Sequence, residues 1–189
     1  MADILLVRHG QTEWSRDGRH TGRTDVPLTE EGRGQAERLA GVLSGRDFAR
    51  VLTSPLSRAS ETCRLAGFGE RAETRDELVE WDYGDFEGLT TEQIRERRPG
   101  WWLWRDGCPG GEAAADVGAR VDTVVRDLHE LEDAAILFAH GHLLRVLAAR
   151  WVGLEPERGA LLRLETAALS KLGWEREQPV ITLWNEQAA

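Results

Sequence analysis

A buried strand predicted near the start of the chain ends at two nitrogen-rich side chains. Residues 4–7 are aliphatic, and Arg8, His9 and Gly10 follow them directly. A neutral imidazole can attack phosphorus and form a phosphoamide, and neighbouring cations favour both its deprotonated form and an incoming phosphate. A lone histidine is more often a surface or core residue than a catalyst. The position of His9 after a buried strand, beside an arginine, makes it a candidate nucleophile.

A second cation lies where helix electrostatics alone would not place it. The short strand predicted over 51–53 is followed by a helix that we expect Ser54 to cap, with Pro55 at its first position. Arg58 falls in the first turn of this helix, where a cation opposes the helix dipole. Because a guanidinium at a helix N-terminus forms an anion site, we interpret Arg58 as a phosphate ligand rather than an exposed side chain.

The third strand, predicted over 134–139, ends at His140, Gly141 and His142. Two histidines around a glycine could indicate a metal site. Zinc would require three or four ligands, however, and the sequence contains no HExxH, CxxC or similar spacing. We therefore expect neither a metal nor a cofactor at this strand end.

An acidic loop over 77–88 holds five carboxylates, one of which could donate a proton. Such loops are usually only solvated. Phosphoryl transfer from an alkyl phosphate, however, requires a proton for the leaving alkoxide, and a carboxylic acid can supply it. Spacing alone does not choose among the candidates, which are Glu77, Glu80, Asp82, Asp85 and Glu87.

These candidate residues come from segments that alternate between strand and helix. The predicted helices begin near Thr29 and Ser54, cover about 91–98 and 112–131, and follow His142, and residues 166–184 indicate two strands around a polar turn. This pattern predicts one α/β domain over 1–189. We expect a three-layer sandwich with a mostly parallel central sheet flanked by helices, and an antiparallel strand in the C-terminal segment. Ligands bind beyond the carboxyl ends of such strands, where the cations and histidines should meet.

The bulk composition excludes several classes of protein. A net charge of −9 argues against a non-specific nucleic-acid binder, although a local cluster of arginines can still dominate its own pocket. Residues 4–7 are too few for a secretory signal or a membrane span. Cys63 and Cys108 cannot form a disulfide framework, and Cys63 falls on the apolar side of a helix. We expect a cytoplasmic protein without nucleic-acid or membrane partners.

Three tryptophans, Trp101, Trp102 and Trp104, gather in the stretch PGWWLWRDG. Core packing or a helix staple is the default interpretation of such a cluster. The adjacent Arg105 and the glycines after it are equally consistent with a flap over a binding site, and both interpretations stay open.

Five sequence blocks together resemble the histidine phosphatase superfamily, in its phosphoglycerate-mutase-like branch. They follow the family's order from about residue 4 to 153, and they are LLVRHGQTEW, GRTDVPLTEEGRGQA, TSPLSRASETC, EWDYGDFEG and FAHGH. The RHG triplet alone is a weak signal, whereas five ordered blocks are specific.

The resemblance implies a catalytic role for five positions. His9 corresponds to the nucleophile that becomes phosphohistidine, and Arg8, Arg58 and His140 to the rest of a phosphate pocket that stabilises the equatorial oxygens. Glu80, in the spacing L-x-E-x-x-x-G-x-x-E-G, matches the general acid that protonates the leaving group and then activates water.

The resemblance also implies binding groups around that pocket. The backbone of Gly141 and the Thr21-Gly22 turn would donate to the substrate or its phosphate. Ser15 stands where many members have asparagine, and its hydroxyl can still donate to phosphate. Arg145 resembles a residue that holds a distal phosphate, although it could equally be an exposed helix arginine.

Within the family, the motifs are closer to phosphatases, including broad acid phosphatases and sedoheptulose-bisphosphatase-type enzymes, than to glycolytic mutases. The mutases have a longer insertion with a basic, proline-containing segment before the second histidine, and only about 50 residues separate Gly88 from His140 here. We predict a metal-independent phosphomonoesterase for small phosphorylated metabolites, possible substrates being sugar phosphates or bisphosphates. The alternatives are a phosphomutase and a non-catalytic module that binds a phospho-ligand. Dimers are common among cytoplasmic enzymes of this size, which makes a homodimer a reasonable expectation.

Overall fold

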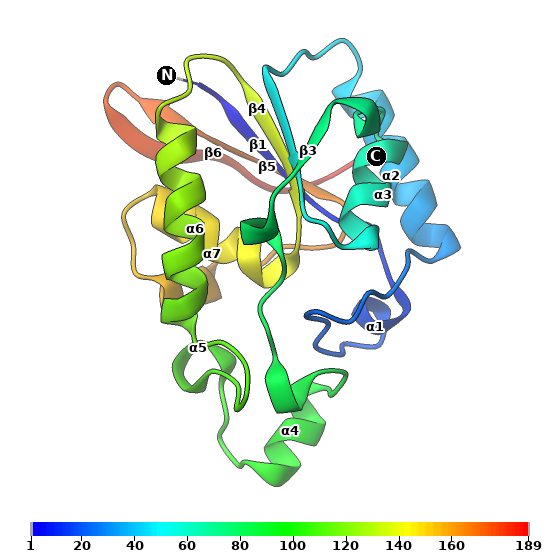
Figure 1. Ribbon diagram of the computed structural model, residues 1–189, viewed down its shortest axis with the longest axis vertical. Coiled ribbons are helices and arrows are strands. Elements are labelled where there is room, and N and C mark those ends of the chain that lie inside the picture. Colours follow the sequence, from blue (N-terminus) through cyan, green and yellow to red (C-terminus); the bar gives the residue numbers. More distant parts are fainter. Residues whose placement is uncertain (1, 189) are drawn as a thin grey trace.

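A mixed sheet of six strands runs through the computed structural model, which describes residues 2–188 (Figure 1). The strands are β1 (Ile4–Arg8), β2 (Arg50–Thr53), β3 (Ala72–Thr74), β4 (Ala135–Ala139), β5 (Ala168–Glu175) and β6 (Gln178–Gln187). Their order in space is β3-β2-β4-β1-β5-β6. The first four strands are parallel to their neighbours among them, whereas β5 is antiparallel to both β1 and β6. The predicted mostly parallel sheet with an antiparallel C-terminal part is confirmed.

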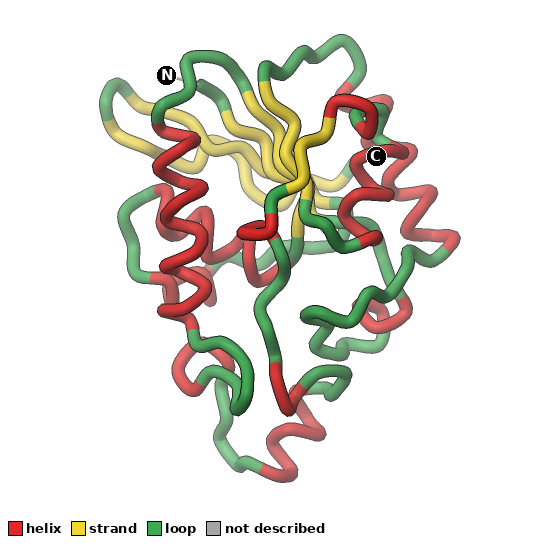
Figure 2. Tube along the Cα trace, in the orientation of Figure 1, coloured by secondary structure: helices red, strands yellow, loops and turns green. Residues whose placement is uncertain are grey.

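Helices pack on both faces of this sheet (Figure 2). One layer contains α2 (Glu30–Leu43) and α3 (Ser57–Leu65), and the other contains α6 (Ala114–His129) and α7 (Gly141–Trp151). Three short helices lie away from these layers, towards the bottom of Figure 1: α1 (Glu13–Arg16), α4 (Thr91–Arg97) and α5 (Leu103–Asp106). The 3₁₀ turns are η1 (Gly69–Arg71), η2 (Asp76–Leu78), η3 (Gly84–Phe86) and η4 (Pro156–Leu161).

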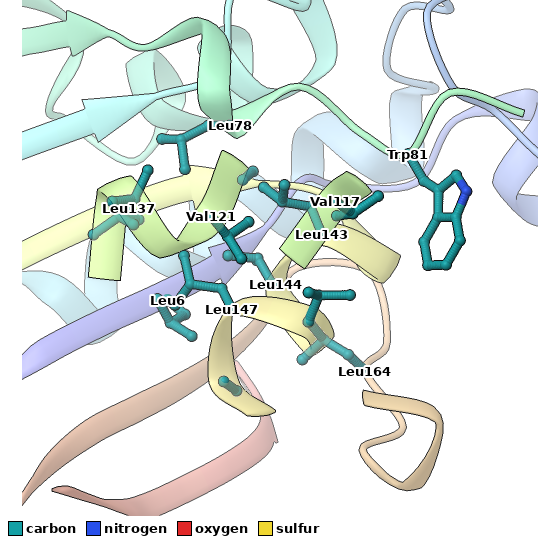
Figure 3. Packing of buried hydrophobic residues seen from close by; sticks show 14 of the residues in the cluster. Leu6, Leu78, Trp81, Val117, Val121, Leu137, Leu143, Leu144, Leu147 and Leu164 are labelled. Atoms are coloured by element: carbon teal, nitrogen blue, oxygen red, sulfur yellow. The ribbon is translucent and has the colours of Figure 1, made fainter. Parts of the chain in front are cut away.

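The strand that precedes His9 is buried on both faces. Successive side chains of a strand point to opposite sides. Ile4 and Leu6 therefore pack with α6 and α7, and Leu5 and Val7 pack with α2 and α3. Figure 3 shows Leu6 within the first of these clusters. Because both faces are enclosed, β1 is a rigid support for the residue that follows it.

The start of α3 differs from the prediction. The helix begins at Ser57 rather than at Pro55, and its N-cap residue, Leu56, makes no side-chain cap. The Ser54 hydroxyl accepts a long bond from the Leu56 amide, at 3.3 Å, and bonds to His140 at 2.8 Å. Ser54 is therefore a buried partner of a histidine, not the cap of this helix.

Several short elements were not predicted from the sequence. The strand β3 and the helices α1 and α5 have only three or four residues each, which is too few for a hydrophobic period to appear. Longer elements were predicted well. Thr29 caps α2 through its hydroxyl, at 3.0 Å from the Gly32 amide, and α4 and α6 lie within their predicted ranges.

The loop after His9 lies backbone against backbone on the first turn of α2. A Cβ on Gly10 would overlap the carbonyl group of Gly32, and the Gly10 amide donates to the Thr62 hydroxyl at 3.0 Å. We expect Gly10→Ala to lower the free energy of unfolding by about 1–3 kcal/mol, because the backbone must shift to relieve the overlap. Urea denaturation measures this loss. Gly41→Ala, at an open position in α2, is the control and should raise stability by about 0.5–1 kcal/mol.

Candidate active site

The predicted edge of the sheet opens into a cavity of about 370 Å³. That volume falls within the range of small-molecule sites. Seven of the predicted site residues line it: Arg8, His9, Ser15, Thr21, Glu80, Gly141 and Arg145. Arg58 and His140 do not line the cavity, but both are fully buried and His140 packs edge-on against the His9 ring, with centroids 5.2 Å apart. The structure thus brings the predicted residues together from four separate segments.

His9 presents one ring nitrogen with a free lone pair. Its Nδ1 lies 2.7 Å from the Gly10 carbonyl oxygen, which can only accept, so Nδ1 carries the proton. The Nε2 atom is then the unprotonated one, and the backbone amide extends the β1–β4 ladder by donating to Ala139 at 2.9 Å. Desolvation and the guanidiniums of Arg58 and Arg8 hold the pKa of His9 well below its usual range. The imidazole is therefore neutral and oriented.

Arg8, which lines the cavity, has an unsatisfied buried donor. Its Nη1 donates to the Leu164 carbonyl at 2.6 Å. Among residues 2–188, its Nε is the one buried side-chain nitrogen or oxygen without a hydrogen-bond partner. A Cβ on Gly141 would lie 3.2 Å from this atom, so only glycine leaves the approach to it open. An orphaned buried N–H costs about 1–3 kcal/mol, which an anionic ligand would recover.

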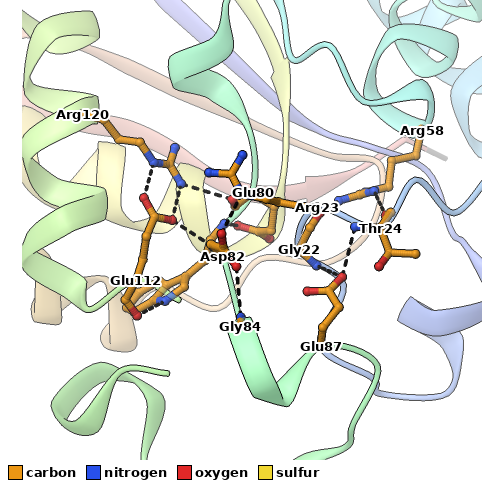
Figure 4. Close-up of polar contacts among 11 residues, drawn as sticks. Gly22, Arg23, Thr24, Arg58, Glu80, Asp82, Gly84, Glu87, Glu112 and Arg120 are labelled. Atoms are coloured by element: carbon orange, nitrogen blue, oxygen red, sulfur yellow. Dashed lines mark hydrogen bonds and ion pairs between the residues drawn. The ribbon is translucent and has the colours of Figure 1, made fainter. Parts of the chain in front are cut away.

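Arg58 is held by backbone carbonyls instead of carboxylates. Its Nη1 donates to the Thr24 carbonyl at 2.9 Å (Figure 4). Its Nη2 donates to the carbonyls of Gly22 at 2.8 Å and Thr21 at 3.2 Å. The Gly22 amide donates to Glu87 at 2.9 Å. In this arrangement the Thr21-Gly22 turn supplies acceptors that orient Arg58, and the amide of Gly22 is already engaged. The full positive charge of Arg58 remains beside the cavity.

His140 is tied to the same guanidinium. The Arg58 Nε–H donates to His140 Nδ1 at 3.2 Å, so Nε2 carries the ring proton and donates to the Ser54 hydroxyl at 2.8 Å. Burial and the positive charge of Arg58 hold the pKa of His140 well below its usual range. Both nitrogens are engaged, so His140 orients Arg58 in this structure. Direct contact with a phosphate would require it to exchange one of these bonds.

The geometry separates Glu80 from the other acidic candidates, because it alone among them lines the cavity. Its Oε1 accepts from the Trp81 amide at 2.9 Å and the Leu143 amide at 2.8 Å, and its Oε2 accepts from the His142 amide at 3.0 Å. Two of these donors belong to the first turn of α7. Three of the other four carboxylates hold loops together: Asp82 pairs with Arg23, Glu77 with Arg75, and Glu87 with two amides.

Comparison with known proteins agrees with this geometry. The model of the histidine phosphatase superfamily, branch 1, matches residues 4–187. The chain belongs to the histidine phosphatase superfamily.

Its relatives include named phosphatases. An acid phosphatase of Mycobacterium tuberculosis is 46% identical over 177 residues, covering 91% of this chain and 86% of the relative. The sedoheptulose 1,7-bisphosphatase of Saccharomyces cerevisiae is 39% identical over 182 residues, covering 79% and 67%. The solved structure of an open reading frame from M. tuberculosis superposes with a TM-score of 0.94 at 38% identity, over 100% of this chain and 99% of that one.

This histidine phosphatase also contains a clamp on its acidic loop that sequence reasoning missed. Arg120 of α6 donates to the Glu80 carbonyl at 3.2 Å and forms a two-point ion pair with Glu112 at 2.7 and 3.0 Å (Figure 4). It also donates to the Glu77 carbonyl at 2.8 Å. Glu112 in turn accepts from the Asp82 amide at 2.8 Å. The loop is therefore fixed on both sides of Glu80. Only the fold brings these residues together, so no local motif could have revealed the clamp.

The tryptophan segment belongs to the core, as the first interpretation expects, and it also lines the cavity. Trp101 and Trp104 are 3% and 5% exposed and belong to the core, yet both also line the cavity. Trp102 is 45% exposed at the cavity wall. Arg145 is an inner wall residue: its Cζ lies 4.6 Å from the centre of the Trp104 ring, and it donates to the Gly159 carbonyl at 3.0 Å and the Ala160 carbonyl. It is half-buried rather than an exposed helix arginine.

Ser15 lines the cavity but is already bonded locally. Its Oγ accepts from the Thr12 amide at 2.9 Å and donates to the Thr12 carbonyl at 3.0 Å, within the cap of α1.

The structure also contains a polar pair that the sequence did not predict. The Tyr83 hydroxyl and His142 Nδ1 are 2.6 Å apart. Desolvation moves the pKa values of Tyr83 up and His142 down, so both are neutral and Tyr83 donates.

The remaining sequence expectations concern cysteines, metals and membranes. Cys63 is fully buried as predicted, and burial raises the pKa of its thiol to about 12. Within residues 2–188, no three His, Cys, Asp or Glu side chains gather as metal ligands would. None of the helices in the same range is long and apolar enough to cross a membrane.

The buried histidines make stability depend on pH. His9, His140 and His142 have pKa values well below 6.5 in the fold, whereas in the unfolded chain they bind protons as the pH falls through 6.5. The unfolded state then holds more protons, so the free energy of unfolding should fall below pH 6.5, by up to about 1.4 kcal/mol per pH unit for each histidine. Urea denaturation at pH 7, 6 and 5 measures this slope. His142→Gln should make it shallower, and a slope that is flat in the unsubstituted protein would contradict the assignment.

Proposed function

We propose that this protein is a metal-independent phosphomonoesterase that hydrolyses small phosphorylated metabolites through a phosphohistidine. The observation that carries the proposal is that Arg8, with an unpaired Nε, and His9, with a free lone pair on Nε2, line one cavity together with Glu80. We further propose that it works in the cytoplasm, as a homodimer, without nucleic-acid partners.

In the first step, His9 Nε2 attacks phosphorus on the side opposite the leaving oxygen. The P–N bond forms as the P–O bond breaks, and the acid form of Glu80 protonates the leaving alkoxide. Arg8 donates to an equatorial oxygen, and the charge of Arg58 stabilises the phosphoryl group as its charge redistributes. His140 and the carbonyls of 21, 22 and 24 hold Arg58 in place for this step.

In the second step, water enters the position that the alcohol has left. The Glu80 carboxylate takes a proton from the water, whose oxygen attacks phosphorus, and the P–N bond breaks with its electron pair returning to Nε2. Inorganic phosphate leaves, and Glu80 is again in its acid form. The backbone amides at the start of α7 keep this carboxylate in one position through both steps. Thr21, Ser15, Gly141 and Arg145 are proposed to contact the substrate, Arg145 through a distal phosphate.

The experiment is a phosphate-release assay in chelator, first with p-nitrophenyl phosphate and then with a panel of sugar monophosphates and bisphosphates. Release that persists in chelator supports the proposal. No release from any substrate would contradict it and favour a non-catalytic binding module. A rate that collapses in chelator would indicate a metal enzyme, and phosphoglycerate isomerisation faster than hydrolysis would indicate a mutase.

A further inference from the structure

The cavity wall is strongly cationic although the chain as a whole is acidic. The net charge is −9, yet the side chains that line the cavity include four arginines and one carboxylate, Glu80. Arg8 belongs to the proposed site of the reacting phosphate, and Arg145, which also contacts the Trp104 ring and two carbonyls, already has a proposed role in binding a distal phosphate. The other two, Arg19 and Arg95, have no role in the mechanism described above.

Arg19 and Arg95 come from two neighbouring segments that line the cavity. Arg19 forms an isolated β-bridge with Thr90, the N-cap residue of α4, and Arg95 lies on α4 itself. Thr91 and Arg95 are four residues apart, so they share one face of that helix, and both line the cavity. The two arginines therefore reach the same cavity from neighbouring segments.

Each of these guanidiniums is oriented by a backbone carbonyl and keeps most of its donors free. Arg19 Nη1 donates to Gly88 at 3.3 Å, and Arg95 Nε donates to Trp101 at 3.0 Å. Neither forms an ion pair with a carboxylate of residues 2–188, whereas Arg105 of α5 pairs with Asp106 at 2.7 Å. Two oriented arginines without a neutralising acid are a site for an anion.

Trp102 lies on the same wall. Its indole is 45% exposed, although its neighbours Trp101 and Trp104 are buried. An exposed aromatic ring beside a cavity offers an apolar surface to the carbon skeleton of a ligand.

We propose that Arg19 and Arg95 form a second anion subsite at the cavity mouth. The substrate then carries a second anionic group, a phosphate or a carboxylate, joined to the reacting phosphate by a carbon skeleton that packs on Trp102. This inference rests on the proposed function, because it takes His9 as the position of the reacting phosphate.

The test compares substrates that differ only in the second anion. One pair is fructose 6-phosphate and fructose 1,6-bisphosphate, and the other is sorbitol 6-phosphate and 6-phosphogluconate, so the two pairs distinguish a second phosphate from a carboxylate. The member with two anions should have the higher kcat/KM in at least one pair. Arg19→Gln and Arg95→Gln should each lower kcat/KM for the substrate with two anions about tenfold, mainly by raising KM. They should change kcat/KM for the substrate with one anion less than about twofold. Arg97→Gln, on another face of α4, is the matched control and should change neither.

Each outcome decides between the alternatives. Equal effects of the variants on both members of a pair, or no preference for the second anion in either pair, would overturn the subsite. Hydrolysis of p-nitrophenyl phosphate without such a preference overturns the subsite and leaves the proposed function standing, whereas no hydrolysis at all contradicts the proposed function itself. Circular dichroism and thermal unfolding establish that each variant is folded before its kinetics are compared.

Discussion

His9→Ala should abolish phosphate release, lowering kcat by at least about 10⁴-fold, because it removes the nitrogen that is proposed to accept the phosphoryl group. His140 cannot replace His9, since its two ring nitrogens are hydrogen bonded to Arg58 and Ser54. Steady-state release of p-nitrophenol measures the loss. Rapid acid-free quenching of the unsubstituted enzyme with labelled substrate should also trap a phosphoenzyme that is stable in base and absent from the variant.

The matched control for this prediction is His129→Ala. His129 lies on α6 against Trp151 and Trp174, and it does not line the cavity. The His129→Ala variant should keep the activity of the unsubstituted enzyme and form the phosphoenzyme. A His9→Ala variant that turns over at the rate of this control would rule out the covalent mechanism.

Glu80→Gln should reveal the proton donor through its dependence on the leaving group. An alkoxide needs a proton as it leaves, whereas p-nitrophenolate does not. The rate of the phosphorylation step should therefore fall by about 10²–10⁴-fold for alkyl phosphates and much less for p-nitrophenyl phosphate. The glutamine carbonyl oxygen can still accept from the Trp81 and Leu143 amides, whereas its NH2 group cannot accept from the His142 amide. Single-turnover kinetics with the two kinds of substrate measure the difference.

Asp85→Asn, in the same loop but outside the cavity wall, is the control and should behave as the unsubstituted enzyme with both substrates. Slowing by the same factor for aryl and alkyl phosphates would argue that Glu80 has a structural role only. The general acid would then have to be sought elsewhere in the cavity.

Much of the scaffold follows from patterns within single segments. The aliphatic run before Arg8 predicts a buried strand, and the apolar stripes of α2 and α6 predict helices, because the hydrophobic effect acts on each of these segments in the same way in any context. The parallel arrangement then brings Arg8, His9, Arg58 and His140 to one edge. The start of α3 was predicted wrongly because Ser54 satisfies a long-range partner, His140, that no local rule contains.

The choice among the acidic residues shows where local patterns end. The local sequence does not distinguish the five carboxylates of this loop, because what separates them is the set of groups that the fold places beside each one. They are Glu77, Glu80, Asp82, Asp85 and Glu87. The amides of α7 contact Glu80 from 62 and 63 positions away along the chain, and Arg120 reaches its carbonyl from 40 positions away. The family resemblance selected Glu80, and the structure supplies the physical reason why this residue faces the cavity.

The place of β1 between β4 and β5 has a consequence for how the protein is made. The partners of β1 begin at Ala135 and Ala168, so this apolar strand has no neighbour in the sheet while most of the chain is still being synthesised. Sheets with such distant pairings form late and leave apolar segments exposed to aggregation meanwhile. A nascent chain that stops before β4 lacks both of the strands that pair with β1. The proposed nucleophile, His9, therefore precedes in the chain both of the strands that hold β1 in the sheet.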